Sequence, residues 1–275
     1  MLKNKKVIVI LILSSLACFL TTIPLLAKER YIDKNIFLTD LNHVNLTLQT
    51  ATDKNGLKKL IMDKKPKVLY LEEWILSEKG NTNVLKKIYK QAKKNDIKLY
   101  LVVGRNQWIG TKGVNSTLYS LDKYESYIDG IVLRTEPNKL NVWKDDMSIK
   151  AQILNLMLDA YSAIHINAKK RNKKFIASFP FWFAEFKGPL GTFPQDTCKY
   201  VDKIIFLIDK PERINEIEVK WNDITCPYNI NLTKRALQQD EDGIHEIYYK
   251  LKNKLVLYSN FQGYIIDSDS TLKED

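Results

Sequence analysis

The sequence predicts an α/β protein, and the expected architecture is a (β/α)8 barrel of the TIM type. After the first 27 residues, short apolar runs alternate with segments of helical periodicity, and eight such runs occur in the chain of 275 residues. Most of the runs are continuously apolar, which is typical of parallel strands covered by helices. Eight β units fit a closed barrel. A doubly wound parallel sheet is the alternative.

The N-terminal segment, 1–27, is set apart by its charge pattern. Three lysines precede the uncharged run Val7–Ala27, and charge returns at Lys28. This order is typical of a signal peptide that is removed after export. The run is also long enough to cross a bilayer as an uncleaved membrane anchor. In either case we expect one barrel domain over 28–275, secreted or membrane-anchored and therefore outside the cytoplasm.

The expected strands are short runs rich in Val, Ile, Leu and aromatic residues, bounded by polar or turn-forming residues. In chain order they are Val44–Thr50, Lys67–Glu73, Ile97–Val103, the apolar part of Ile128–Pro137, Lys174–Phe183, Val201–Asp209, Asp223–Leu232 and Lys254–Asn260. The run Asp223–Leu232 differs from the others because its apolar residues alternate with polar ones. Alternation of this kind indicates a strand with one polar face.

The segments between these runs carry apolar residues at helical spacing. The expected helices are Asn55–Lys64, Asn81–Asp96, Ser148–Asn172 and Gly243–Leu251. The third is the clearest, because its apolar residues form one continuous stripe and Ser148 stands at its start as an N-cap. Gly104, Gly110 and Gly113 predict a loop after the third strand.

In a barrel of this kind, chemistry takes place at the carboxyl ends of the strands, and these positions carry most of the tryptophans. Four of the five tryptophans stand at or beyond the end of an expected strand, namely Trp74, Trp108, Trp143 and Trp182. An indole ring offers a flat apolar face that suits stacking on a sugar ring. The alternative is that these rings fold back over the rim of the barrel and pack there.

Carboxylates also gather at the expected strand ends, and glycoside hydrolysis needs two of them. Glu136 follows the fourth strand and Asp209 the sixth, and the ends of these strands face each other across one mouth. Glu72 is a third catalytic candidate. Expected substrate-binding residues are Arg134, Trp74, Trp108, Trp182, Glu185 and Asn260. A capping role for Asp209 and a surface role for Glu72 are the structural alternatives.

Arg134 precedes Glu136 by two residues, so both side chains leave the strand on the same side. If they approach each other, the guanidinium opposes any rise in the pKa of the Glu136 carboxyl. The sequence therefore leaves two readings of Glu136 open, a proton-transfer group or the partner of Arg134 in an ion pair.

The stretch "DGIVLRTEP", a buried strand that ends in Glu136-Pro137, resembles the fourth strand of glycoside-hydrolase barrels. Those barrels carry their acid/base in an Asn-Glu-Pro motif, whereas Thr135 precedes Glu136 here. The resemblance implies a possible acid/base role for Glu136. It implies no second residue, because the nucleophilic Glu of strand seven has no counterpart in "DITCPYNINLT". A barrel that binds a polysaccharide or cell-envelope glycan without cleaving it is thus the alternative function.

Several other classes of protein are disfavoured by composition and motifs. The net charge is +11, but the lysines are scattered along wet helical faces, so we expect no nucleic-acid partner. The three histidines, His43, His165 and His245, form no cluster with metal-ligand spacing, and no cofactor motif is present. Beyond the N-terminal segment the chain has two cysteines, Cys198 and Cys226, which can pair in an oxidising compartment or remain separate buried thiols.

The N-terminal segment generates a first prediction. If the signal is cleaved, the mature protein begins near Lys28, because the apolar run ends on the small residue Ala27. Intact-mass measurement of the protein isolated from its native host checks this. A chain that still begins at Met1 or Leu2 and fractionates with membranes would establish the anchor instead.

Overall fold

The computed structural model describes the residues 34–38, 56–78, 82–143, 146–189, 191–214, 221, 223–233, 241–255 and 257–267. The expected signal or anchor, 1–27, and the expected first strand, Val44–Thr50, both lie outside these ranges. Within them, no helix combines the length and the apolar character needed to cross a membrane.

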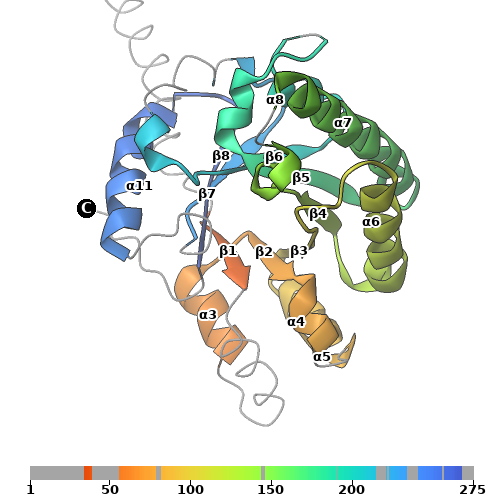
Figure 1. Cartoon of the computed structure of the whole chain (residues 1–275). Coiled ribbons are helices and arrows are strands. Elements are labelled where there is room, and N and C mark those ends of the chain that lie inside the picture. Colours follow the sequence, from red (N-terminus) through yellow and green to blue (C-terminus); the bar gives the residue numbers. More distant parts are fainter. Residues whose placement is uncertain are drawn as a thin grey trace, which may run out of the picture. The chain divides into compact units, whose positions relative to one another are not determined.

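Eight parallel strands form the centre of the structure (Figure 1). They are β1 (Lys34–Leu38), β2 (Val68–Glu72), β3 (Lys98–Val103), β4 (Gly130–Arg134), β5 (Lys174–Pro180), β6 (Lys203–Leu207), β7 (Tyr228–Asn231) and β8 (Phe261–Asp267). Each strand pairs with the next in the sequence, and β1 pairs with β8, so the sheet closes into a barrel. The expected parallel α/β fold is confirmed, and its strand order is that of a TIM-type barrel rather than a doubly wound sheet.

Helices connect the strands on the outside of the barrel. They are α3 (Gly56–Lys64), α4 (Glu73–Glu78), α5 (Thr82–Lys94), α6 (Gly110–Tyr124), α7 (Met147–Lys170), α8 (Phe193–Thr197) and α11 (Glu241–Leu255). Short 3-10 turns are η1 (Glu125–Tyr127), η2 (Pro137–Lys139), η3 (Asn141–Trp143), η4 (Phe181–Glu185) and η5 (Pro211–Arg213). Two expectations are corrected here. The segment with Gly110 and Gly113 is the helix α6 rather than a loop, and α7 is capped by the Asp146 carboxylate, which accepts from the Ser148 amide.

The end of the chain also differs from the expectation. The run Lys254–Asn260 was expected as the last strand, but its first two residues complete α11, and the strand β8 begins only at Phe261. The reason lies in α11, whose buried face continues through Ile244, Tyr248, Leu251 and Leu255 at helical spacing. The apolar character of Leu255 therefore belongs to the helix.

The interior of the barrel is filled by side chains from alternate positions of the strands, as the pleat of a strand requires. A buried cluster there consists of Val68, Tyr70, Tyr100, Val102, Val132, Ile176, Ile205 and Ile265. The Tyr70 and Tyr100 rings lie 5.6 Å apart between their centroids. By the same alternation, the next inward positions toward the carboxyl ends are Glu72 on β2 and Arg134 on β4. The apolar interior thus ends where the candidate site begins.

Two aspartates hold the opposite end of the barrel by the same device. Asp129, just before β4, accepts from the Leu99 amide of β3 at 2.9 Å, and Asp202, just before β6, accepts from the Phe175 amide of β5 at 2.9 Å. Each carboxylate also receives a lysine ammonium, from Lys93 and Lys174 respectively, at 2.6 Å. These contacts fix adjacent strands in register at their amino ends. The candidate site lies at the opposite, carboxyl ends.

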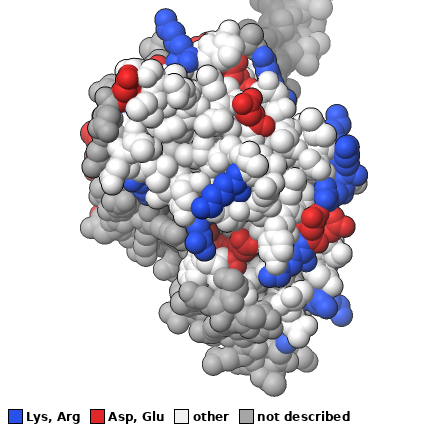
Figure 2. Space-filling model, turned by 45° about the vertical axis from the view of Figure 1, so that its right-hand side comes forward, with Lys and Arg blue, Asp and Glu red and all other residues white. Residues whose placement is uncertain are grey.

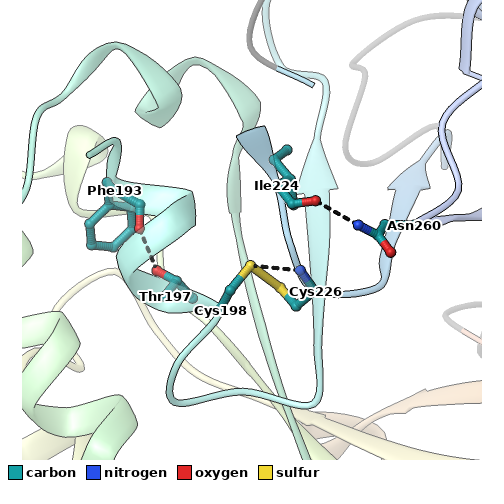
Figure 3. The surroundings of a disulfide bond; sticks show 6 residues. All are labelled: Phe193, Thr197, Cys198, Ile224, Cys226 and Asn260. Atoms are coloured by element: carbon teal, nitrogen blue, oxygen red, sulfur yellow. Dashed lines mark hydrogen bonds between the residues drawn. A yellow bond between two sulfur atoms is a disulfide. The ribbon is translucent and has the colours of Figure 1, made fainter. Parts of the chain in front are cut away.

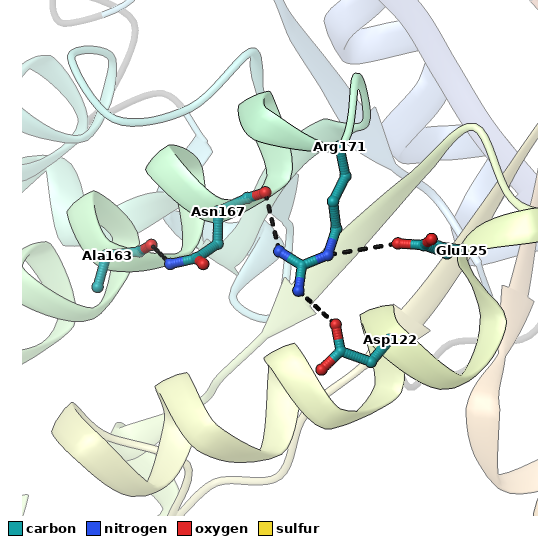
Figure 4. A network of polar contacts seen from close by, with 5 residues as sticks. All are labelled: Asp122, Glu125, Ala163, Asn167 and Arg171. Atoms are coloured by element: carbon teal, nitrogen blue, oxygen red, sulfur yellow. Dashed lines mark hydrogen bonds and ion pairs between the residues drawn. The ribbon is translucent and has the colours of Figure 1, made fainter.

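The helix α6 is tied to α7 by a network around Arg171 (Figure 4). The Arg171 guanidinium forms ion pairs with Asp122 of α6 and with Glu125 of η1, and donates to the Asn167 carbonyl at 3.1 Å. Because α6 carries one wall of a pocket at the mouth, this network helps to position that wall.

Cys198 and Cys226 form a disulfide, which confirms the pairing that the sequence left open (Figure 3). Their Cα atoms are 5.2 Å apart, and the Cys226 amide donates to the Cys198 sulfur at 3.2 Å. Cys198 directly follows α8, and Cys226 lies two residues before β7, so the bond joins the entries of β6 and β7 at the amino end of the barrel.

The disulfide generates a second prediction. Replacing both cysteines by alanine should lower the free energy of unfolding by about 2–4 kcal/mol, because the cross-link restricts the unfolded chain. Urea unfolding of the variant and of the wild type measures the difference, and wild type treated with reductant should shift by a similar amount. Alkylation of Cys198 or Cys226 in folded, unreduced protein would contradict the bond.

Candidate functional site at the mouth of the barrel

A buried ion pair forms the floor of the mouth. The Arg134 guanidinium on β4 lies 2.5 Å from the Glu72 carboxylate on β2, and their side chains are 16% and 5% exposed. Of the two readings that the sequence left open, the structure gives Arg134 a carboxylate from another strand as its ion-pair partner, rather than Glu136. Glu72, one of the catalytic candidates, has the role of a structural counter-ion here.

The backbone beside this pair depends on Gly104, the residue after β3. Its φ of +128° is unfavourable for residues with a side chain, and an added Cβ would stand 2.0 Å from the Arg134 carbonyl oxygen. Only glycine lets the end of β3 pass so close to the end of β4. The position of Arg134, and with it the ion pair, relies on this contact.

Glu136 lies just beyond β4, on the rim. Its carboxylate forms an ion pair with the ammonium of Lys139, the last residue of η2, at 2.5 Å. The Glu136 side chain is 15% exposed. Pro137 begins that turn and fixes the direction in which the chain leaves the strand. Glu136 is thus half-buried at the mouth, and within the described part of the chain its ion pair is with the surface cation Lys139.

Asp209 lies two residues beyond β6, and its carboxylate is held by Trp182 of η4. The indole Nε1 donates to the two oxygens at 3.0 and 3.3 Å. Burial raises the pKa of Asp209 above its ordinary value, and the nearby charge of Glu136 raises it further. The hydrogen bond from Trp182 and the charge of Lys210 act in the opposite direction. The charge of Glu136, just beyond β4, therefore acts on the carboxyl of Asp209 beyond β6.

Trp143 and Trp182 are parts of a packed aromatic cluster rather than exposed plates. Both are 6% exposed. Trp143 stacks on Phe183 at 5.3 Å between ring centroids, and Lys210 covers the Trp182 ring at 4.5 Å. The alternative that rim aromatics pack over the barrel holds for these two residues, and the expected stacking of sugar on Trp182 is corrected. Trp182 instead orients the carboxylate of Asp209.

Trp74 and Trp108 lie in a different environment. Both line a pocket of about 490 Å³ above the ends of β2 and β3, between α4 and α6. Glu72, Glu73 and Arg105 also contribute to its walls. The α6 side of this pocket was missed in the sequence, because the helix itself was expected to be a loop.

Two further candidates are engaged in contacts within the protein. Glu185 is in η4 and forms an ion pair with Arg213 of η5 on the surface. Asn260 precedes β8, so it stands at the amino end of the barrel, where it donates to the Ile224 carbonyl at 2.9 Å (Figure 3). Its placement at the mouth followed from the wrong strand, and that expectation is corrected. Among the described residues, no group of three or more His, Cys, Asp or Glu side chains is arranged to hold a metal ion.

Known structures resemble this barrel at low sequence identity. A candidate α-L-fucosidase from Bacteroides thetaiotaomicron has 9% identity and a TM-score of 0.51, over 86% of this chain and 85% of that chain. The C-terminal domain of a candidate chitinase from Desulfitobacterium hafniense has 10% identity and a TM-score of 0.50, over 74% and 67%. Orotidine 5′-monophosphate decarboxylase from Methanocaldococcus jannaschii has 16% identity and a TM-score of 0.45, over 86% and 88%.

No protein-family model and no curated protein sequence matches the chain. At these identities, the likeness to solved structures shows a barrel of the TIM type and carries no statement about activity.

The ion pair at the floor of the mouth generates a third prediction. Glu72→Leu or Arg134→Met alone should lower the free energy of unfolding by about 3–5 kcal/mol, because each leaves a buried charge without its partner. The double variant should recover most of that loss, since it leaves no uncompensated charge. Chemical unfolding of the wild type, the two single variants and the double variant forms a double-mutant cycle. Lys139→Ala, which opens the more exposed pair with Glu136, serves as the control and should cost less than about 1 kcal/mol. Single variants as stable as wild type would rule out the pair.

Proposed function

We propose that the chain is an exported barrel protein that acts on a polysaccharide or cell-envelope glycan, with Glu136 and Asp209 as its two carboxylates. The observation that carries this proposal is the raised pKa of Asp209 at the end of β6, within electrostatic reach of Glu136 at the end of β4. Two carboxyl groups with different environments at one mouth are what glycosidic bond hydrolysis needs.

The environments suggest how the roles divide. Asp209 is the better proton donor, because burial and the charge of Glu136 both favour its protonated form. Glu136 is the better ionised partner, because the Lys139 ammonium lies 2.5 Å away. In this proposal Asp209 gives its proton to the oxygen of the leaving sugar. As the glycosidic bond breaks, Glu136 either takes a proton from the water that attacks the anomeric carbon or attacks this carbon itself; in the second case water then releases the sugar from Glu136, with Asp209 as the base. This assigns to Asp209 the acid role that the sequence resemblance gave to Glu136.

Two observations support the location outside the cytoplasm and the class of partner. The disulfide between Cys198 and Cys226 suits an oxidising compartment. On the face shown in Figure 2, basic side chains are interspersed with acidic and uncharged ones and form no continuous stripe. A dispersed charge of this kind favours a solvated surface over a nucleic-acid site. The segment 1–27 would supply a membrane attachment if it is retained.

A second candidate function is binding of a glycan without cleavage. The pocket of about 490 Å³ favours it, because Trp74 and Trp108 line a space of the size that small ligands occupy. That pocket lies on the β2–β3 side of the mouth, whereas the carboxylates lie at β4 and β6. Binding and turnover can therefore be separated by experiment.

The proposed roles generate a fourth prediction. Glu136→Gln and Asp209→Asn should each reduce turnover of a dye-linked polysaccharide by at least ~10²–10⁴-fold, because an amide can neither transfer the proton nor act as the nucleophile. Glu246→Gln is a matched control, since this exposed carboxylate also pairs with a lysine, Lys250, but lies on α11. Turnover should be measured together with melting. Folded variants of Glu136 and Asp209 that keep wild-type turnover would exclude the catalytic roles, and a wild type that binds glycan without cleaving it would establish the second function.

The pKa of Asp209 generates a fifth prediction. Because its folded-state pKa lies above the unfolded value, the folded protein binds this proton more tightly, and stability contributed by Asp209 falls as pH rises between the two values. Asp209→Asn removes this dependence. The stability of the variant relative to wild type should therefore increase with pH across that interval, in urea unfolding followed from about pH 3 to 7. A relative stability that is flat or falls with pH would contradict the burial of this carboxyl.

A further inference from the structure

The pocket between α4 and α6 has walls of two kinds, aromatic and charged. Trp74 and Trp108 are half-buried in it, and Tyr119 of α6 is 66% exposed at its edge. The first turn of α6 sits directly against the Trp108 carbonyl, because Gly113 has no side chain; an added Cβ would stand 2.5 Å from that oxygen. The position of Trp108 is thus built into the packing of α6. Aromatic faces in a pocket of about 490 Å³ suit one or a few sugar rings.

The acidic side chains of this pocket are already engaged within the protein. Glu72 is paired with Arg134 at 2.5 Å. Glu73, at the start of α4, accepts from the Ser120 hydroxyl at 2.5 Å. It also acts on Lys123 of α6, whose pKa is raised mainly by the hydrogen bond with Tyr124 and, to a smaller degree, by the charge of Glu73. The charge of Glu72 is therefore balanced by Arg134, and the charge of Glu73 by Lys123.

Arg105 is the remaining charge on the pocket wall. It follows Gly104 directly after β3 and is exposed, and it makes no ion pair with any residue in the described part of the chain. Because Arg134, which does not line the pocket, pairs with Glu72, the guanidinium of Arg105 is the cation on the pocket wall that is left without a carboxylate among the described residues. A planar guanidinium binds a carboxylate through two parallel hydrogen bonds, a geometry that a neutral hydroxyl does not match.

We propose that this pocket binds a sugar ring that carries a carboxylate, with Arg105 on the carboxylate and Trp108 against the ring. The proposal rests on the proposed function for the class of ligand, and it adds that the glycan is acidic. The basic net charge acts in the same direction: three of the +11 charges belong to the lysines of segment 1–27, and the rest raise the local concentration of an acidic polymer near the protein. Recognition at this pocket involves no covalent step and does not require Glu136 or Asp209.

The experiment uses trigalacturonate and its methyl ester as matched probes, since the two share their rings and differ in charge. Titration calorimetry on the Glu136→Gln protein keeps any turnover out of the measurement. The acid should bind at least tenfold more tightly than the ester. Arg105→Ala should remove that preference while leaving the affinity for the ester unchanged. Trp108→Ala should weaken both probes. Lys112→Ala, which removes an exposed cation of α6 that does not line the pocket, is the control for net charge and should keep the preference.

Equal affinity for acid and ester, no binding of trigalacturonate, or an unchanged preference in Arg105→Ala would each overturn the inference. None of these results bears on the turnover of the Glu136 and Asp209 variants, which tests the proposed function by itself. Conversely, loss of the catalytic proposal would leave a preference for the acid and its dependence on Arg105 intact.

Discussion

The ion pair between Arg134 and Glu72 determines how the mouth of this barrel is organised. It occupies the last inward layer above an apolar interior, where a charge without a partner would be strongly unfavourable. Since Arg134 pairs with Glu72, the neighbouring Glu136 lies on the rim in an ion pair with Lys139 and acts electrostatically on Asp209. The same pairing removes the charge of Glu72 from the pocket above β2 and β3. One interaction thus sets the electrostatics of both regions of the mouth, and Gly104 provides the space that the interaction needs.

Much of the fold can be predicted from the apolar patterns of the sequence, and the wrong expectations for α6 and β8 have physical causes. Continuous apolar runs identified β2 to β6, because strands of a covered parallel barrel are buried on both faces. The helix α6 was missed because its buried face consists partly of Gly113, Thr117 and Ser120, which leave only a weak apolar stripe. The strand β8 was misplaced because the apolar end of α11 looks like a strand, whereas β8 itself contains Gln262 and Gly263.

The candidate site was predictable to the extent that strand order determines it. Glu136 and Asp209 are brought to one mouth simply because each follows an even-numbered strand. The partner of Arg134 could not be read from the chain, since Glu72 is distant in sequence and closer candidates were available. Which tryptophans are packed and which line the pocket also depends on tertiary contacts that the sequence does not show. Phe183 and Lys210 enclose Trp143 and Trp182, whereas Trp74 and Trp108 border open space.

The disulfide at the amino end of the barrel has a consequence for the segment it encloses. Cys198 and Cys226 bracket β6 and Asp209, so this part of the chain is a covalently closed ring of the backbone. If a protease cuts the connection after β6, the two fragments stay joined, and the packed strands can hold Asp209 near its place. Such a nick would be invisible in electrophoresis without reductant and would separate the fragments once thiols are added. The disulfide lies at the amino end of the barrel, yet it would keep Asp209 attached at the opposite, carboxyl end after such a cut.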